Sequence, residues 1–331
     1  MSVKHANISI FVPHLGCPNM CSFCNQHHIA RTEKIPSKAD VDEAVEIATN
    51  SKNYNPSATE IAFFGGSFTA IDKNLMTELL SAAHKHVKSG AVAGIRISTR
   101  PDSIDDAVLS VLKNYGVSTI ELGAQSMDDS VLAMNNRGHS ADDVRKASWL
   151  IKEYGFNLGL QMMTGLYGSN DDLDVSTAEE IIKLKPDCVR IYPTITLEGT
   201  RLQELFESGK YTPADIASSA KLCAKINSLF EKENIPVIRL GLHTIDERAF
   251  VAGPWHPAFK ELCDSVVFKE KIESMLGVKG RYIAYVNPKD LSKAKGQKKS
   301  NIEYFKAKGY ELEIKADNSI EINDVLIKGC E

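Results

Sequence analysis

Residues 8–26 read ISIFVPHLGCPNMCSFCNQ, an apolar run followed at once by a loop with three cysteines. The run 8–12 has the length and β-branched content of a buried strand. Cys17, Cys21 and Cys24 follow within a polar loop, which makes a purely structural role for three buried thiols unfavourable. Three closely spaced thiols directly after a strand suit a soft metal centre.

The spacing Cys17-x3-Cys21-x2-Cys24 leaves two kinds of metal centre open. A closed zinc site takes four ligands, and His27 or His28 is near enough in sequence to supply the fourth. An iron–sulfur cubane held by three cysteines instead leaves one iron open to a ligand from outside the protein. The spacing favours the cluster and keeps zinc as the alternative.

The segments that follow alternate between short apolar runs and amphipathic stretches up to about residue 245. Strands are expected over 8–12, 60–65, 94–98, 118–123, 158–163, 188–192 and 236–240. Helices are expected over 40–50, 74–87, 141–155 and 214–233. Six Ser-x-x-acid sequences predict helix starts, at Ser37, Ser103, Ser126, Ser140, Ser169 and Ser176. Such alternation predicts repeated βα units around a parallel sheet, an α/β fold.

The composition excludes several classes of protein. With 331 residues and 43% hydrophobic content, the chain can form one large domain and a small one. Its net charge of −4 gives no overall attraction for nucleic acid or anionic lipid. The N-terminus does not resemble a signal peptide, and no apolar stretch is long enough to span a membrane. A tight cluster of three among seven cysteines fits a reducing compartment, so we expect a cytoplasmic protein.

The cysteine loop and four later segments together resemble the radical S-adenosylmethionine (SAM) superfamily. Phe23 fills the aromatic position of that family's cysteine motif. The other segments, in the expected order, are FFGGSFTA (63–70), IRISTRPDSID (95–105), ELGAQSMDDSVLAMNNRGHS (121–140) and GLQMMTGLYG (159–168). The resemblance implies a partial (β/α)6 barrel and a [4Fe-4S] cluster on Cys17, Cys21 and Cys24. It further implies reductive cleavage of SAM to a 5′-deoxyadenosyl radical, with electrons from a donor such as flavodoxin or ferredoxin.

The same resemblance implies which residues contact SAM. They are Gly65, Gly66 and Ser67 through the backbone, and Thr99, Gln125, Arg137 and Gln161 through polar groups. Arg137 suits the SAM carboxylate because a guanidinium matches a carboxylate bidentately. For Gln125 and Gln161 the alternative is a buried amide satisfied within the protein. Tyr192 and His243 follow strands at the expected rim of the barrel, so they are candidates for substrate contact and catalysis, with packing as the alternative.

Within the superfamily, STRPD, ELGAQS and VRIYPTITLEGTRL (189–202) look most like the group of the Elongator catalytic subunit and the oxygen-independent coproporphyrinogen oxidases. The first of these is nearer. The residues after 240 show no segment like the acetyl-CoA-binding loop of the Elongator subunit's acetyltransferase domain. We therefore do not expect its carboxymethylating reaction.

The C-terminal block is locally basic. From Pro288 to Lys308 seven lysines stand against two acidic residues, a local net charge of +5. The block is expected to run strand, helix, basic turn, helix, with two further strands within 310–323. It resembles a KH module, in which a turn between two helices clamps a nucleic-acid backbone. The candidate RNA contacts are Lys293, Lys295, Gly296, Lys298 and Lys299. The alternative is a solvated lysine-rich face on a small capping domain.

These expectations combine into one leading hypothesis. Residues 1–245 are expected to form the barrel, 246–279 a helical linker or cap, and 280–331 the KH-like domain. The protein is expected to be a radical SAM enzyme that modifies tRNA or rRNA. One alternative is a radical SAM enzyme acting on a small metabolite or tetrapyrrole. The other is a non-catalytic, zinc-stabilised RNA-binding protein.

Overall fold

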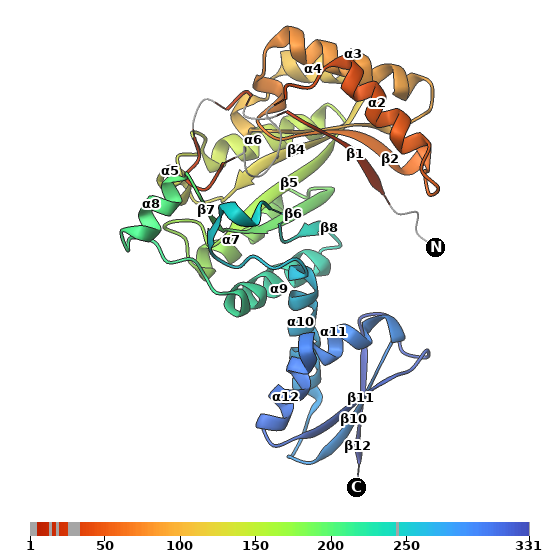
Figure 1. Ribbon diagram of the computed structural model, residues 1–331, viewed down its shortest axis with the longest axis vertical. Coiled ribbons are helices and arrows are strands. Elements are labelled where there is room, and N and C mark those ends of the chain that lie inside the picture. The colour runs from red at the N-terminus through yellow and green to blue at the C-terminus, as the bar shows by residue number, and fades with distance from the viewer. Residues whose placement is uncertain (1–4, 13–14, 18–19, 26–33, 243–244, 331) are drawn as a thin grey trace.

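Seven parallel strands form a curled sheet, a half-barrel, in the first 240 residues (Figure 1). The computed structural model describes residues 5–12, 15–17, 20–25, 34–242 and 245–330. The sheet has the order β1-β2-β3-β4-β5-β6-β8. The strands are β1 (Ala6–Phe11), β2 (Thr59–Phe64), β3 (Gly94–Thr99), β4 (Val117–Gln125), β5 (Asn157–Thr164), β6 (Cys188–Pro193) and β8 (Val237–Leu240). Each coincides with a strand predicted from the sequence, and the predicted α/β half-barrel is confirmed.

Helices cover the convex face of this sheet (Figure 1). They are α2 (Lys38–Thr49), α3 (Lys73–Lys88), α4 (Asp106–Asn114), α6 (Ala141–Glu153), α7 (Asp171–Lys183) and α9 (Ile216–Lys232). Two shorter helices, α5 (Asp129–Met134) and α8 (Arg201–Glu207), lie at the end of the sheet instead (Figure 1). Alternate strand residues such as Phe63, Ile95 and Ile97 are fully buried in one core with helix residues such as Leu79. Because side chains alternate along a strand, the remaining strand residues face the concave side.

The predicted helix starts were right at two of six serines. Ser37 and Ser140 cap α2 and α6, each with a complete capping box. Three predictions were wrong because a side chain closer to the first turn accepts the free N–H group instead; these caps are Asp105, Asp128 and Asn170. The sixth prediction was also wrong, since Ser176 lies inside α7, whose first turn begins at Asp171.

A small ribbon lies after the sheet's sixth strand. It pairs β7 (Thr196–Leu197) antiparallel with β9 (Phe250–Ala252). Its residues Leu197 and Phe250 pack with Ile195, Ile245 and Trp255 in a separate apolar cluster. The ribbon thus ties the segment after β6 to the segment that leads into the C-terminal part.

Helix α10 (Phe259–Met275) joins the half-barrel to the C-terminal part (Figure 1). Its first half gives Phe259 and Cys263 to the core of the half-barrel, and its second half gives Phe268 and Ile272 to a second core. One helix therefore belongs to both hydrophobic cores, and each core depends on it for closure.

The second core lies under a three-stranded sheet of order β11-β10-β12. Its elements are β10 (Arg281–Val286), α11 (Leu291–Lys295), α12 (Ser300–Ala307), β11 (Glu311–Ala316) and β12 (Val325–Cys330). The last strand was expected within 310–323, and that was wrong. A turn capped by Asp317 and the left-handed backbone of Asn323 (φ 67°) occupy the expected range, so the strand begins at Val325.

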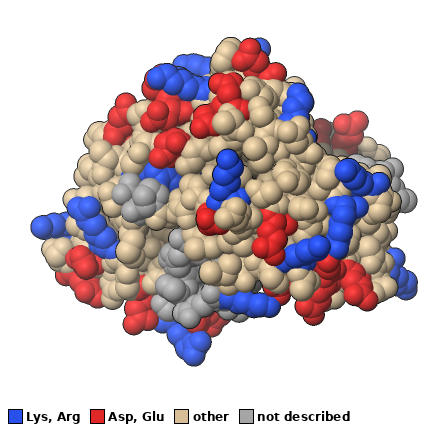
Figure 2. Space-filling view, turned by 90° about the horizontal axis from the view of Figure 1, so that it is seen from above, with Lys and Arg blue, Asp and Glu red and all other residues tan. Residues whose placement is uncertain are grey.

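None of the helices in the described part of the chain is long and apolar enough to cross a membrane. On the face seen from above Figure 1, basic and acidic side chains are interspersed (Figure 2). That face therefore shows no large field of one sign.

Candidate active site

The start of the cysteine loop packs closely against the Gly-Gly-Ser segment that ends β2. The Ser67 amide donates to the Leu15 carbonyl at 2.9 Å. A Cβ on Gly66, whose φ is +48°, would lie 2.3 Å from the Leu15 oxygen. A Cβ on Gly16 would lie 2.3 Å from the Ser67 oxygen. The two segments approach backbone to backbone, which only glycine permits at these positions.

A buried asparagine, Asn135, holds the far side of the cysteine loop. Its carbonyl accepts from the Ser22 amide at 3.1 Å, and its side-chain oxygen accepts from the Ser22 hydroxyl at 2.6 Å. Its Nδ2 donates to the carbonyls of Val131 and Tyr167, each at 2.8 Å. Both Ser22 and Asn135 are fully buried. Sequence reasoning missed this residue, because its partner lies 113 positions away.

The three cysteines form no disulfide, and each is half-buried. Arg137 donates from one guanidinium nitrogen to Cys21 Sγ at 3.0 Å and from another to the Gly123 carbonyl at 2.7 Å. Burial and the neighbouring Cys21 raise the pKa of the Cys17 thiol, while Arg100 and Arg137 oppose that rise. The arginines supply the positive charge that thiolate ligands require.

The side chains of the described residues do not form a ready site for a single metal ion. No three His, Cys, Asp or Glu side chains among them converge in the way that one ion would require. A cubane places its cysteines on different irons, so it makes no such demand. His27 and His28, the possible fourth ligands of zinc, lie outside the described residues.

The structure brings Ser67 and Thr99 together but uses their hydroxyls for each other. Ser67 Oγ lies 2.9 Å from Thr99 Oγ1 and accepts from the Arg100 amide at 3.2 Å. Thr99 Oγ1 also lies 2.6 Å from Thr69 Oγ1. These bonds fasten the ends of β2 and β3 to each other. The backbone at Gly65 and Gly66, held close to Val12 and Leu15, is what remains for a ligand.

Three buried polar atoms near the end of β4 lack a hydrogen-bond partner among the described residues. They are Gln125 Oε1, Arg137 Nε and His139 Nδ1. Gln125 follows a bulge in β4 and has a left-handed backbone (φ 63°). Burial, followed by the charge of Arg137, lowers the pKa of His139 to about 4, so this ring is neutral at pH 7. Buried polar atoms are normally paired, so this group marks a place for a polar ligand.

Glu121 is the centre of a charge network on the concave face that sequence reasoning missed. It is 1% exposed and accepts from Arg96 at 2.8 Å and from Arg190 at 2.6 and 3.0 Å. Gln161, predicted to contact SAM, donates to Glu121 at 2.9 Å. The sequence did contain a signal for this network, since each of these charged residues lies within an otherwise apolar strand. The sequence did not show which of them pair across the strands.

The network extends to the amino end of the sheet through Glu60. Arg96 donates to Glu60 at 2.8 Å, and His5 and Ser118 contact the same carboxylate at 2.8 and 2.6 Å. Burial alone would raise the pKa of Glu60, but these partners, His5 first and then Arg96, hold it at about 2. The carboxylate is therefore ionised throughout the physiological range.

Of the two catalytic candidates, Tyr192 and His243, the structure describes only Tyr192. Tyr192 lies near the carboxyl end of β6, half-buried, where it packs against a cluster of Val131, Met163 and Leu166. Burial raises the pKa of its hydroxyl. His243 lies outside the described residues. Their roles in catalysis stay predictions.

The lysine turn, residues 296–299, joins α11 to α12 as the sequence predicts. Lys298 and Lys299 are exposed and have left-handed backbones (φ 51° and 64°). A Cβ on Gly296 would lie 2.4 Å from Ser300 Oγ and 2.9 Å from Ser265 Oγ of α10, so glycine is required there. Gln297 contacts the His256 ring at 3.2 Å, which links the turn to the segment before α10.

The other two lysine candidates are less accessible. Lys293 pairs with Asp290 at 3.1 Å and with Asp264 at 3.6 Å, so its charge is already compensated. Lys295 is half-buried. The exposed charge of the turn therefore comes from Lys298 and Lys299.

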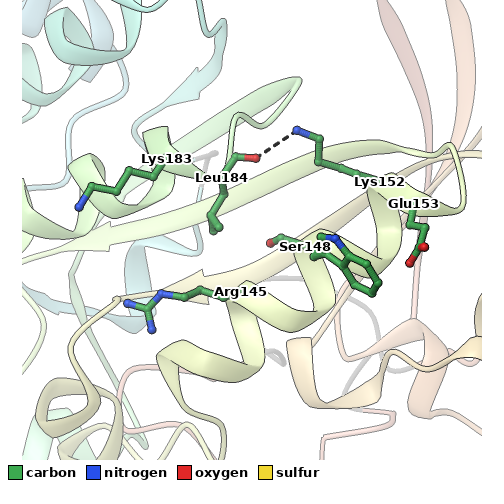
Figure 3. Close-up of a pocket in the computed structure, with 7 residues that line it drawn as sticks. Arg145, Ser148, Lys152, Glu153, Lys183 and Leu184 are labelled. Atoms are coloured by element: carbon green, nitrogen blue, oxygen red, sulfur yellow. Dashed lines mark hydrogen bonds between the residues drawn. The ribbon is translucent and has the colours of Figure 1, made fainter.

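A shallow pocket on the helical exterior lies away from all these residues (Figure 3). It is formed by α6 and the end of α7, and Trp149 on its wall is 64% exposed. Arg145 and Lys183 both pair with Glu180, and Lys152 donates to the Leu184 carbonyl at 3.2 Å. With its cations engaged in this way, the pocket adds nothing to the candidate active site.

Comparison with known proteins bears on the whole arrangement. A family profile described as the radical SAM superfamily matches residues 11–183. A second profile, described as the radical SAM C-terminal domain, matches residues 186–267. The first match includes the cysteine loop, the Gly-Gly-Ser segment, Arg137 and all of the charge network except His5 and Arg190.

Two curated relatives and one solved structure extend this similarity. The tRNA uridine(34) acetyltransferase of Dehalococcoides mccartyi is 25% identical over 67% of this chain and 56% of its own length. Elongator complex protein 3 of Homo sapiens is 34% identical over 41% of this chain and 25% of its own length. Archaeal Elp3 of Methanocaldococcus infernus, solved without residues 1–46, aligns with a TM-score of 0.65 at 20% identity, over 85% of this chain and 66% of its own. The chain thus spans about half of the first relative and a quarter of the second.

Proposed function

The chain belongs to the radical SAM superfamily, and on that premise we propose that it modifies tRNA or rRNA by radical chemistry started at a [4Fe-4S] cluster. The observation that carries the proposal is the placement of the cysteine loop. It lies between the glycine segment of β2 and Arg137, next to the unpaired polar atoms at the end of β4. Names of relatives that act on tRNA uridine 34 support RNA as the substrate class.

The residues present fit the cofactors that the family implies. Cys17, Cys21 and Cys24 would hold the cluster, and the backbone at Gly65 and Gly66 together with Gln125 and Arg137 would hold SAM. The unpaired Gln125 Oε1 and Arg137 Nε supply one acceptor and one donor for a zwitterionic amino acid moiety. When bound and reduced by a donor such as a flavodoxin or ferredoxin, these cofactors supply a radical that removes a hydrogen atom from the substrate.

Arg137 performs two tasks in this proposal. It donates a charge-assisted hydrogen bond to Cys21 Sγ, which fixes the position of that sulfur beside the guanidinium. Its bond to the Gly123 carbonyl fixes the guanidinium over the end of β4. The remaining Nε–H is buried and unpaired, so it is available to a carboxylate there. Asn135 and the glycines hold the loop in place so that these groups meet.

Residues 280–331 are proposed as the part that binds RNA, in the manner of a KH module. The turn between α11 and α12 presents the exposed Lys298 and Lys299, and lysines act as point charges for phosphate. Such a function places the protein in the cytoplasm, with the RNA and the reductants.

The enzyme class is tested on protein reconstituted anaerobically with iron and sulfide. The expected result is about four irons per chain and release of 5′-deoxyadenosine from SAM after reduction with dithionite. A variant with Cys17, Cys21 and Cys24 all changed to Ala should lose both. Cys223→Ala, a buried thiol of α9, is the matched control and should keep both. One zinc per chain with no 5′-deoxyadenosine would identify the zinc-stabilised alternative.

The substrate class is tested separately, by mass spectrometry of nucleosides from cells with and without the gene. A modified nucleoside should be missing from tRNA or rRNA when the gene is deleted. Restoration by the wild-type chain, and no restoration by the triple cysteine variant, would assign that nucleoside to this enzyme. Unchanged RNA together with active SAM cleavage would favour a small-metabolite substrate.

A further inference from the structure

The last strand of the half-barrel carries an arginine that lacks an acidic partner. Arg239 on β8 is the register partner of Arg190 on β6, so both side chains lie on the concave face. Arg190 is held by two hydrogen bonds from its guanidinium to Glu121. Arg239 donates instead to two neutral carbonyls, from Nε to Gly241 at 2.9 Å and from Nη2 to Leu242 at 2.6 Å. In the part of the chain that the structure describes, no carboxylate pairs with it.

The surroundings of Arg239 make this charge costly without a counter-ion. The side chain is half-buried, and an arginine stays charged in proteins. Its neighbours on the concave face are the guanidinium of Arg190 and the hydroxyl of Tyr192, which interact with it electrostatically. Since Glu121 already neutralises Arg190, neither neighbour compensates Arg239. A positive charge so placed attracts an anion.

The geometry of the guanidinium favours a multidentate anion. The two carbonyl bonds fix the plane of the group and use two of its five N–H donors. Three donors remain, on the two terminal nitrogens. A fixed fork of this kind matches the oxygens of a phosphate or a carboxylate.

The position separates Arg239 from the candidate SAM site. Arg137 is bound to Gly123 on β4, and β4 and β8 are three strand spacings apart in the sheet order, about 14 Å at the usual spacing. Two arginines with free donors thus lie along this face, Arg137 beside the central strand β4 and Arg239 on the edge strand β8. They are suited to two different anions.

We infer that Arg239, next to Tyr192, binds a phosphate group of the RNA on the concave face of the half-barrel. The inference rests on the proposed function, because RNA is the polyanion that such a site would take. This contact would hold the backbone of the target nucleotide on the β8 side while its sugar or base lies toward the cysteine loop. It would be a second contact with the RNA, in addition to the contact at the lysine turn.

Two variants distinguish phosphate binding by Arg239 from a purely structural role, in which Arg239 only stabilises the backbone at Gly241 and Leu242. Arg239→Gln removes the charge, and Arg239→Lys keeps it but cannot make the paired carbonyl bonds. Arg145→Gln is the matched control, because it also removes one arginine charge, from the exterior pocket on α6 (Figure 3). All are tested as full-length reconstituted enzyme. The probe is tRNA and rRNA purified from cells that lack the gene, with dissociation constants measured at several salt concentrations.

The expected result is about tenfold weaker RNA binding by Arg239→Gln at low salt, as for loss of one charge-assisted contact. The slope of log affinity against log salt should shrink by about 0.7–0.9, the value for one phosphate contact. Arg239→Lys should keep the wild-type slope, and Arg145→Gln should match wild type throughout. Release of 5′-deoxyadenosine from SAM without RNA should be the same in all four proteins.

Each other result overturns the inference in a distinguishable way. If wild type binds RNA and Arg239→Gln has the same slope of log affinity against log salt, Arg239 makes no phosphate contact, and the proposed function is unaffected. Equal losses in Arg239→Lys and Arg239→Gln identify a structural brace. Loss of SAM cleavage without RNA in Arg239→Gln identifies the SAM carboxylate as the anion. An equal loss in Arg145→Gln indicates a long-range charge effect, and absence of RNA binding by wild type removes the inference together with the proposed function.

Discussion

Changing Glu121 to Gln should destabilise the whole half-barrel, although Glu121 is not proposed to touch a cofactor. Its carboxylate receives three hydrogen bonds from Arg96 and Arg190 and one from Gln161. Arg96 would keep Glu60 as a second partner. Arg190, whose side chain is 9% exposed, would lose the carboxylate that neutralises it. The substitution keeps the shape of the side chain, so the effect reports on charge and hydrogen bonding.

The size of the effect follows from the bonds that a glutamine amide cannot make. One oxygen remains an acceptor, while the NH2 group faces guanidinium N–H donors, so about two charge-assisted bonds are lost. Each such bond contributes about 1.5–3 kcal/mol. Breaking a buried ion pair on one side typically costs about 3–5 kcal/mol. We therefore expect a loss of about 4 kcal/mol in the free energy of unfolding.

The measurement is urea unfolding at pH 7.5, followed by circular dichroism. Glu180→Gln is the control, since it removes a carboxylate that pairs with Arg145 and Lys183 on the surface. Exposed pairs contribute about 0–1 kcal/mol, so this variant should stay near wild type. The double variant Glu121→Gln/Arg190→Gln should be less destabilised than the two single effects combined. A loss under about 1 kcal/mol in Glu121→Gln would refute the reasoning.

Three further predictions concern the supports of the site. Gly66→Ala should cost at least about 2 kcal/mol and lower the iron content after reconstitution, because its Cβ would lie 2.3 Å from a carbonyl oxygen at φ +48°; Gly90→Ala, at φ +73° with open space around it, should cost only about 1 kcal/mol and keep the iron. Glu60 has a folded pKa of about 2, below its ordinary 4.5, so the ionised carboxylate stabilises the fold by as much as ~3 kcal/mol above pH 4.5, and this is lost as pH falls toward 2. Glu60→Gln should therefore flatten the dependence of the urea midpoint on pH between 4.5 and 2. An unchanged dependence would contradict the assignment. Asn135→Ala should cost about 2–4 kcal/mol and reduce iron per chain, since it removes three side-chain hydrogen bonds of the loop anchor; full iron content in this variant would show that the loop holds its place without the anchor.

The sequence was sufficient where the signal is local. All seven strands of the half-barrel were predicted, because each is a short apolar run between turn residues. The cysteine loop and the turn at Gly296 were found because their spacing is itself the signal. The resemblance to the radical SAM superfamily, drawn from the cysteine loop and the segments after it, is confirmed by the matching profile.

The sequence was insufficient where partners are far apart along the chain. Glu121, Arg96 and Arg190 stand on different strands, and only the register of the sheet shows that they meet. Asn135 could not be linked to Ser22 for the same reason. The side chains of Thr99 and Gln161, predicted to contact SAM, have partners within the protein, Ser67 and Glu121. Whether such a side chain bonds to a ligand or to a neighbouring residue depends on distances in the folded protein, which a sequence motif does not specify.

Helix α10 has a consequence for how a target on RNA would be chosen. Its two halves belong to different cores, and Gln297 and Gly296 tie the lysine turn to His256 and to Ser265. These contacts hold the turn against the first half of this 17-residue helix, so packing fixes the distance between the turn and the half-barrel. If the turn binds the backbone of a folded RNA, the nucleotide that reaches the concave face is the one at the matching distance from the bound phosphates. The base of that nucleotide would then be recognised in a second step, after its position in the RNA has been selected.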